Sequence, residues 1–235
     1  MAVAFVGAST VLTMDYTVTL QRPSGTQDGD WMVAAVAMNQ AAPDPSWESG
    51  SGWVEVAVVR EDTIEDMQCR VWVRQATSSD PSSWTLSTNA SYGDNVAAAI
   101  TTWRGAEEPD VAATTIHPGR GGPFTLPTLQ EGPGEGGVIL HVVGACCGTW
   151  SGDDWTWNTP PAGWAGRVLD THLDSDSTIG LAIVEGADLT GPELTISGVG
   201  AETVAARSAT LLIPATPEPP SGPVVLGWGP APVYL

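Results

Sequence analysis

The chain has 235 residues, a mass of 24.3 kDa and 42% apolar residues, so it is long enough and apolar enough to fill a hydrophobic core. Its 8 basic residues, all arginine, stand against 27 acidic residues, which gives a net charge of −19 at pH 7. A field of this sign repels phosphate, and it therefore argues against sequence-independent binding of nucleic acid and against attachment to anionic membranes.

Neither export nor membrane insertion is signalled. Residues 1–6 lack the positively charged start of a signal peptide, and no apolar stretch approaches the roughly 18 residues that a membrane helix requires. We therefore expect synthesis in a cytoplasm without a cleaved export signal. Cys69, Cys146 and Cys147 have neither metal-binding nor redox spacing and are expected to be buried thiols in strands, with a vicinal disulfide between the last two as the alternative.

The composition and the apolar patterns predict strands throughout. With 27 glycines, 19 prolines and 11 tryptophans, the chain suits strands joined by turns better than helices. Alternating or continuous apolar runs predict strands at residues 11–20, 31–39, 53–60, 67–75, 84–88, 96–103, 111–117, 138–146, 166–172, 179–185, 194–197 and 204–213. Segments 31–38 and 138–143 are apolar almost throughout, which is typical of central strands. Trp53 and Trp164, each after a glycine at a strand start, are assigned to the core.

The two halves of the chain resemble each other. At a nearly constant offset, DWMV at 30–33 corresponds to GVIL at 137–140, GW at 52–53 to GW at 163–164, and DNVAA at 94–98 to ETVAA at 202–206. This spacing indicates a duplicated order of strands rather than a solenoid. We predict an all-β fold, a jelly-roll-like antiparallel β-sandwich with an internal pseudo-repeat, in one domain over residues 1–213 with halves of about 1–107 and 108–213. Two small domains joined by residues 118–133 are the alternative.

The composition changes at Pro214. Seven prolines lie between positions 214 and 235, where Glu218 is the only charged side chain, so an extended polyproline-like backbone is favoured there. A solvated tail has no need of apolar anchors, yet this segment contains Pro223, Val225, Leu226, Trp228, Val233, Tyr234 and Leu235. We predict that residues 214–235 form an arm that docks on its own sandwich or on a neighbouring subunit, with a flexible tail as the alternative.

Motifs of catalysis and metal binding are missing from the sequence. It contains no GxSxG, HExxH, Walker loop or CxxC. His117, His141 and His172 share no metal-ligand spacing, and His141, inside an apolar strand, is interpreted as a hydrogen-bonded core residue. We therefore predict no catalytic residue, no metal and no cofactor.

One segment has the residue types of a carbohydrate site, namely Trp150, Asp153, Asp154, Trp155 and Trp157. Aromatic faces can cover sugar C–H patches while carboxylates bond the hydroxyls. The first half has a poorer counterpart in Asp44, Trp47 and Glu48. The alternative is that the tryptophans fill the open ends of the sandwich or lie in a subunit contact. A glycosidase is disfavoured, because two adjacent carboxylates do not face each other across a cleft.

Several segments together resemble a β-sandwich module of bacteriophage tail and other virion proteins, especially in phages of actinobacteria. They are PSGTQDGDWMVAAVAMN (23–39), GW (52–53), VWVRQATSSDPSSWTLS (71–87), AAAITTWRGAE (97–107), GGVILHVVGA (136–145), TPPAGWAGRV (159–168) and ARSATLLIPA (206–215). The resemblance covers roughly residues 1–215 and implies a structural role without catalytic residues. Trp103 stands where the family usually has tyrosine, and the Pro-rich arm has no place in the family pattern.

These observations lead to three hypotheses. The first is a non-enzymatic phage virion protein, a minor tail protein with possible host-surface contact, made in the bacterial cytoplasm and located in the virion. The second is a capsid decoration protein, and the third, from another class, is a carbohydrate-binding adhesin. The expected partners are other virion proteins of tail or capsid, further copies of the chain in a homo-oligomer, and host-surface glycan. Nucleic acid and membranes are not expected as partners.

Overall fold

The computed structural model describes residues 1–38, 44–61, 67–88, 95–117, 121–147, 155–173, 178–198, 201 and 204–217, without the side chains of residues 61, 147, 172 and 173. The strands are β1 (Ala4–Thr13), β2 (Thr17–Gln21), β3 (Trp31–Met38), β4 (Ser46–Trp47), β5 (Val54–Glu61), β6 (Met67–Gln75), β7 (Ser83–Ser87), β8 (Val96–Arg104), β9 (Asp110–His117), β10 (Phe124–Thr125), β11 (Val138–Cys147), β12 (Trp155–Trp157), β13 (Trp164–Leu173), β14 (Thr178–Gly186), β15 (Glu193–Leu194), β16 (Ile196–Gly198) and β17 (Val204–Ile213). Within these ranges there is no α-helix, and hence none that is long and apolar enough to cross a membrane. The predicted all-β class is confirmed.

Each half of the chain forms one large sheet and a smaller cover. The first half has a five-stranded sheet in the order β1-β8-β3-β6-β5 and a three-stranded sheet in the order β2-β7-β4. The second half has a five-stranded sheet in the order β9-β17-β11-β14-β13 and the two-stranded pairs β10-β15 and β12-β16. All pairs are antiparallel, and the order of the large sheet is the same in both halves. The sequence similarity between the halves therefore corresponds to a repeated strand topology.

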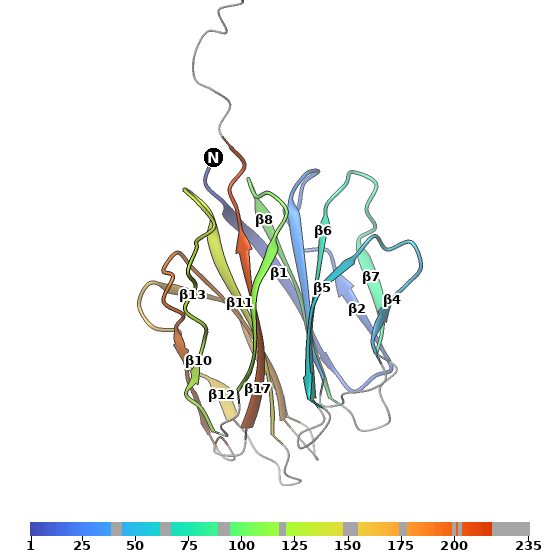
Figure 1. Ribbon diagram of the computed structural model, residues 1–235. Helices are drawn as coiled ribbons and strands as arrows, with labels where there is room; N and C mark the ends of the chain where they lie inside the picture. The colour runs from blue at the N-terminus through green and yellow to red at the C-terminus, as the bar shows by residue number, and fades with distance from the viewer. Residues whose placement is uncertain are drawn as a thin grey trace, which may run out of the picture.

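The two large sheets pack face to face and share the central core (Figure 1). Side chains at alternate positions of β3 and β6 meet side chains of β11, β14 and β17 there, as the pleat of a strand requires. Gly144 of β11 lies at the closest approach, because an added Cβ would be 2.8 Å from the Cβ of Ala37. Cys69 and Cys146 are buried in this core, as predicted, and burial raises the pKa of the Cys69 thiol to about 12.

Each half also encloses a core of its own, which the sequence did not lead us to expect. The outer face of the first large sheet packs under the sheet β2-β7-β4, with Leu20, Trp84 and Ile100 among the buried residues. The second large sheet is covered in the same way by β10, β12 and β15, with Phe124 and Trp155 in the core. The molecule is thus a stack of layers with three apolar clusters, one shared by the two halves and one within each half.

Two predicted strands are wrong in their boundaries: residues 194–197 are divided between β15 and β16, and residues 11–20 are divided between β1 and β2. Residues 4–13 form β1 and residues 17–21 form β2, with a turn between them. The Thr13 hydroxyl donates to the Asp15 carboxylate at 2.8 Å and accepts from the Asp15 amide at 3.1 Å. Short polar side chains that bond nearby backbone in this way stabilise turns, and the Thr-x-Asp pattern was the signal for this one.

All four edge strands of the large sheets carry a bulge. The register shifts at Val6 in β1, Val56 in β5, Ala112 in β9 and Arg167 in β13. Val6 and Ala112 occupy corresponding places in the two halves, as do Val56 and Arg167. A bulge disturbs the row of unpaired backbone groups on an edge and so hinders further strand addition. The repeat therefore extends to the irregularities of the edges.

Candidate functional site

Two of the five residues predicted to bind carbohydrate are core residues. Trp155 and Trp157 are 0% and 9% exposed, and their rings meet edge to face with 5.4 Å between the centroids. Neither indole is available as a platform for a sugar ring, so the prediction is corrected for these two residues in favour of packing. Trp150, Asp153 and Asp154 lie outside the described residues.

The counterpart in the first half is also largely committed to internal contacts. Trp47 stacks on Trp53 with 5.0 Å between ring centroids. Both are partly buried and pack against the core that lies between the first large sheet and the sheet β2-β7-β4. The Asp44 carboxylate pairs with Arg70 and, at 3.3 Å, with Arg60. The Asp44 side chain is 60% exposed, and its Oδ1 serves ion pairs within the chain.

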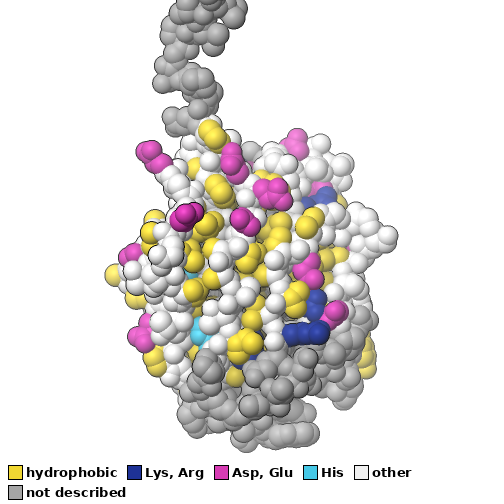
Figure 2. All heavy atoms as spheres, in the orientation of Figure 1, with side chains coloured by type: hydrophobic (Ala, Val, Ile, Leu, Met, Phe, Trp, Pro, Cys, Tyr) yellow, Lys and Arg dark blue, Asp and Glu magenta, His cyan; other side chains and the backbone are white. Residues whose placement is uncertain are grey.

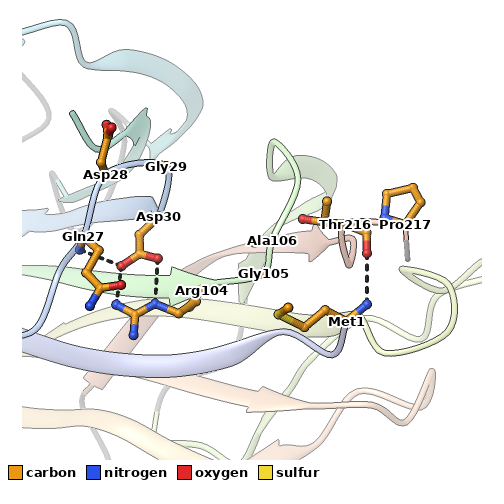
Figure 3. Close-up of a pocket in the computed structure, with 10 residues that line it drawn as sticks. All are labelled: Met1, Gln27, Asp28, Gly29, Asp30, Arg104, Gly105, Ala106, Thr216 and Pro217. Atoms are coloured by element: carbon orange, nitrogen blue, oxygen red, sulfur yellow. Dashed lines mark hydrogen bonds and ion pairs between the residues drawn. The ribbon is translucent and has the colours of Figure 1, made fainter. Parts of the chain in front are cut away.

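A cavity of about 590 Å³ lies at the end of the sandwich where the arm begins. The turn before β3, the end of β8 and the residues after β17 all reach this end, because β3 pairs antiparallel with β8 and β17 ends alongside them (Figure 1). The lining residues are Met1, Gln27, Asp28, Gly29, Asp30, Arg104, Gly105, Ala106, Thr216 and Pro217. Figure 3 shows the Asp30 and Arg104 pair on one side and Met1 with Thr216 on the other.

Asp30 and Arg104 form a two-pronged ion pair. The Arg104 Nε donates to Asp30 Oδ1 at 3.0 Å and Nη2 to Oδ2 at 2.9 Å, while Nη2 also donates to the Gly25 carbonyl at 2.8 Å. Asp30 accepts a further bond from the Gln27 amide at 2.8 Å. The hydrogen bond to Asp30 raises the pKa of the Arg104 guanidinium above its ordinary value. This planar geometry fixes the turn before β3 to the end of β8.

The first residues of the arm are paired with the sandwich. Thr216 donates its amide to the Gly105 carbonyl, and the Glu107 amide donates to the Pro214 carbonyl, both at 2.8 Å. Ala106 and Ala215 form an antiparallel bridge between these bonds. The Met1 amino group donates to the Thr216 carbonyl at 3.1 Å. We call residues 214–217 the arm root. The root continues the sheet geometry, although it lies beyond the last residue of β17.

A second cavity, of about 490 Å³, lies on the other side of the arm root. Both cavities are lined by Met1, Thr216 and Pro217, and the second is completed by Ala2, Glu135, Gly136 and Ala215. The described chain therefore leaves the sandwich at Pro217 between two hollows. The predicted arm anchors Pro223, Val225, Leu226, Trp228, Val233, Tyr234 and Leu235 lie outside the described residues.

Gly29-Asp30 and Trp103-Arg104-Gly105 are separate motifs in the sequence, and the sequence analysis did not bring them together. Asp30 and Arg104 are far apart along the chain, and only the antiparallel pairing of β3 with β8 places the start of one strand beside the end of the other. The only sequence features that could have indicated this ion pair were an acidic residue at the start of one predicted strand and an arginine at the end of another. The change of composition at Pro214 was the signal for the arm, but no sequence pattern indicated that its root pairs with residues 105–107 and with Met1.

Two histidines occupy the outer core of the second half. The His141 Nδ1 is 2.8 Å from the Thr210 hydroxyl, and the His117 Nε2 is 2.9 Å from the Ser208 hydroxyl, and both histidines are buried. The prediction that His141 is a hydrogen-bonded core residue is confirmed. Among the described residues, no group of three or more His, Cys, Asp or Glu side chains is placed to hold a metal ion.

Comparison with known proteins gives no match: no family model, no curated protein and no solved structure is similar to this chain.

We expect the Asp30→Ala substitution to lower the free energy of unfolding by about 1–3 kcal/mol, because the Arg104 guanidinium and the Gln27 amide both lose their acceptor. Urea unfolding followed by tryptophan fluorescence measures this change. The matched control is Asp28→Ala, an exposed carboxylate two residues earlier, which should stay within about 0.5 kcal/mol of the wild type. Equal urea midpoints for the two variants would contradict a stabilising role of the ion pair.

Proposed function

We propose that this chain is a non-enzymatic structural component of a bacteriophage virion, a minor tail protein in the leading version, and that its C-terminal arm holds it in the particle. The observation that carries the proposal is the arm root. Three backbone hydrogen bonds, two with residues 105–107 and one with Met1, tie residues 214–216 to the sandwich. A force on the arm is therefore transmitted to a packed β-fold and not to a loose end.

The architecture supports an assembly role. The strand pairs β1–β8, β2–β7 and β3–β6 are nested, which is how a jelly roll winds, and β9–β17, β10–β15 and β11–β14 repeat the nesting. Jelly rolls are common in viral capsid proteins and in lectins. The bacteriophage setting itself is supported by the resemblance of the motifs between residues 23 and 215. The interior is filled by side chains from both halves, so the two halves form one packed body.

The molecule has two different ends. The arm root and Met1 lie at one end, and the strand ends that flank residues 148–154, Cys147 and Trp155, lie at the other (Figure 1). In the proposed arrangement the arm end faces the particle and the opposite end faces outward. In this orientation Cys147 and Trp155, the described residues on either side of residues 148–154, lie at the end that faces the host surface.

The test is removal of the arm beyond its root. A chain ending at Pro217 keeps every hydrogen bond of the arm root and should unfold at the same temperature as the full chain. In a phage whose own copy of the gene is deleted, we expect this shortened chain to be absent from purified particles when it replaces the full chain. Particles that still incorporate it would overturn the proposal. The control chain lacks only Ser221 and Gly222, which shortens the arm but keeps all seven anchors, and it should still enter the particles.

Immunogold labelling of intact particles decides between the two virion positions. Label at the tail or its tip supports the minor tail protein. Label spread over the head makes the chain a capsid decoration protein, for which the acidic surface and the anchored arm serve equally well. Absence of label from purified particles, with the chain present in infected cells, would contradict both versions.

A further inference from the structure

We infer that the two cavities beside the arm root receive the arm of a second copy of this chain, so that copies are linked by exchanged arms. The inference rests on the proposed role of the arm in assembly and names its partner. The occupant is the segment 224–228, Val-Val-Leu-Gly-Trp. Charge, reach and the shape of the site each favour this occupant.

Charge limits how two copies can meet. Each copy carries a net charge of −19, and Figure 2 shows acidic side chains around the end where the arm begins. Exposed carboxylates at this end belong to Asp28, Glu107, Glu108 and Glu135. Two such surfaces repel each other. Residues 219–235 contain no charged side chain, so this segment can approach a second copy without a like-charge penalty.

The length of the arm favours binding to the cavities of a neighbouring copy rather than to the cavities of its own chain. The arm leaves from Pro217, which itself lines both cavities. Pro219 and Pro220 follow almost at once and favour an extended backbone of about 3.1 Å per residue. At this rise per residue, a stretch of seven residues beyond Pro217 would span about 20 Å and one of eighteen residues about 55 Å. A globular chain of this length has a radius of gyration of about 17 Å, so the arm is long enough to span a neighbouring copy.

The larger of the two cavities suits an apolar peptide, whereas the lining of the other is more polar than apolar. The cavities of about 590 and 490 Å³ are within the range of ligand sites in proteins. Met1, Ala106 and Pro217 contribute apolar surface to the first cavity, and the Arg104 stem lies beside them in Figure 3. The ion pair with Asp30 holds the Arg104 guanidinium in place, so Arg104 is already positioned at the cavity before any segment binds.

The experiment is photo-crosslinking between isotope-labelled copies of the full chain. A benzophenone amino acid replaces the exposed Asp28 at the cavity, and a control probe replaces the exposed Thr114 on the edge strand β9. ¹⁵N-labelled probe chains are mixed with ¹⁴N chains that carry no probe, irradiated and analysed by mass spectrometry. We expect ¹⁵N peptides around residue 28 joined to ¹⁴N peptides from residues 218–235, and no such product from the Thr114 probe.

Three results would overturn the inference. They are crosslinks to the arm of the same labelled chain only, no arm peptide at the Asp28 probe above the Thr114 background, and a monomeric mass in light scattering for the full chain at the crosslinking concentration. We expect light scattering to give the mass of an oligomer for the full chain and the mass of a monomer for the chain ending at Pro217. Val225→Asp should reduce the crosslink yield at least about tenfold, because it buries an unpaired charge in the contact.

The two proposals fail separately. If the chain ending at Pro217 is lost from particles while the full chain is a monomer without crosslinks, the arm still serves assembly and its partner is a different virion protein. If that shortened chain enters particles normally, the assembly role of the arm fails, whatever the crosslinks show.

Discussion

Trp155→Ala is expected to lower the free energy of unfolding by about 3–5 kcal/mol, the cost typical of deleting a buried tryptophan. Trp155 has no exposed surface, belongs to the outer core of the second half and packs on β14. Its ring fits there because residue 180 is a glycine, where an added Cβ would be 2.5 Å from the indole. Urea unfolding with an unchanged m-value measures the loss.

Thr156→Ala is the matched control for Trp155, since this neighbour on the same strand points outward and is exposed. We expect it to change the free energy of unfolding by no more than about 0.5 kcal/mol. A Trp155→Ala variant as stable as Thr156→Ala would show that the indole is not packed, and it would reopen the carbohydrate hypothesis for this residue.

The protein is expected to lose stability as the pH falls from 6.5 to about 4, because His117 and His141 are buried in the neutral form. Burial lowers the pKa of both to about 4, and the charge of Arg207 adds to the effect at His117. In this pH window the unfolded chain binds protons that the folded chain does not, so acid favours unfolding. Each histidine then costs about 3 kcal/mol by pH 4. Urea midpoints measured between pH 7 and 4.5 test this.

Variants that replace the histidines by side chains that do not titrate separate the contribution of the histidines to the pH dependence of stability from that of the carboxylates. His141→Asn keeps a partner for Thr210 and His117→Gln one for Ser208, and the double variant should lose most of the pH dependence between 6.5 and 4.5. Burial opposes ionisation of Asp80, but hydrogen bonds from Arg74 and Thr77 hold its pKa below the ordinary value of 3.8. Its contribution is therefore lost only at lower pH. A wild-type stability that stays flat down to pH 4.5 would contradict buried neutral histidines.

The sequence was sufficient for the strands and their repeat because these depend on local patterns. Residues 31–38 and 138–143 are apolar almost throughout, and they lie in the central strands β3 and β11. The similarity between the two halves of the sequence appeared again as the same sheet order. The burial of His141 followed from its place inside an apolar strand, and the burial of Cys69 from the general tendency of free cysteines to be buried.

The carbohydrate site illustrates why residue types alone are insufficient. An indole serves equally well as a sugar platform and as core packing, and the sequence around Trp155 suits both. The decision lies in Gly180, on a different strand, whose missing side chain leaves room for the ring against β14. No local pattern reveals such a pairing, because it depends on which strands become neighbours.

Local sequence patterns were thus enough to predict an all-β chain with a duplicated strand order, a strongly acidic composition and a Pro-rich end with Glu218 as its one charged side chain. They did not predict that each half closes a core of its own, that Asp30 meets Arg104, or that the arm root is hydrogen-bonded to Gly105, Glu107 and Met1. Alternation along a strand shows which side chains face the same way, whereas contacts between distant strands depend on how the whole chain folds.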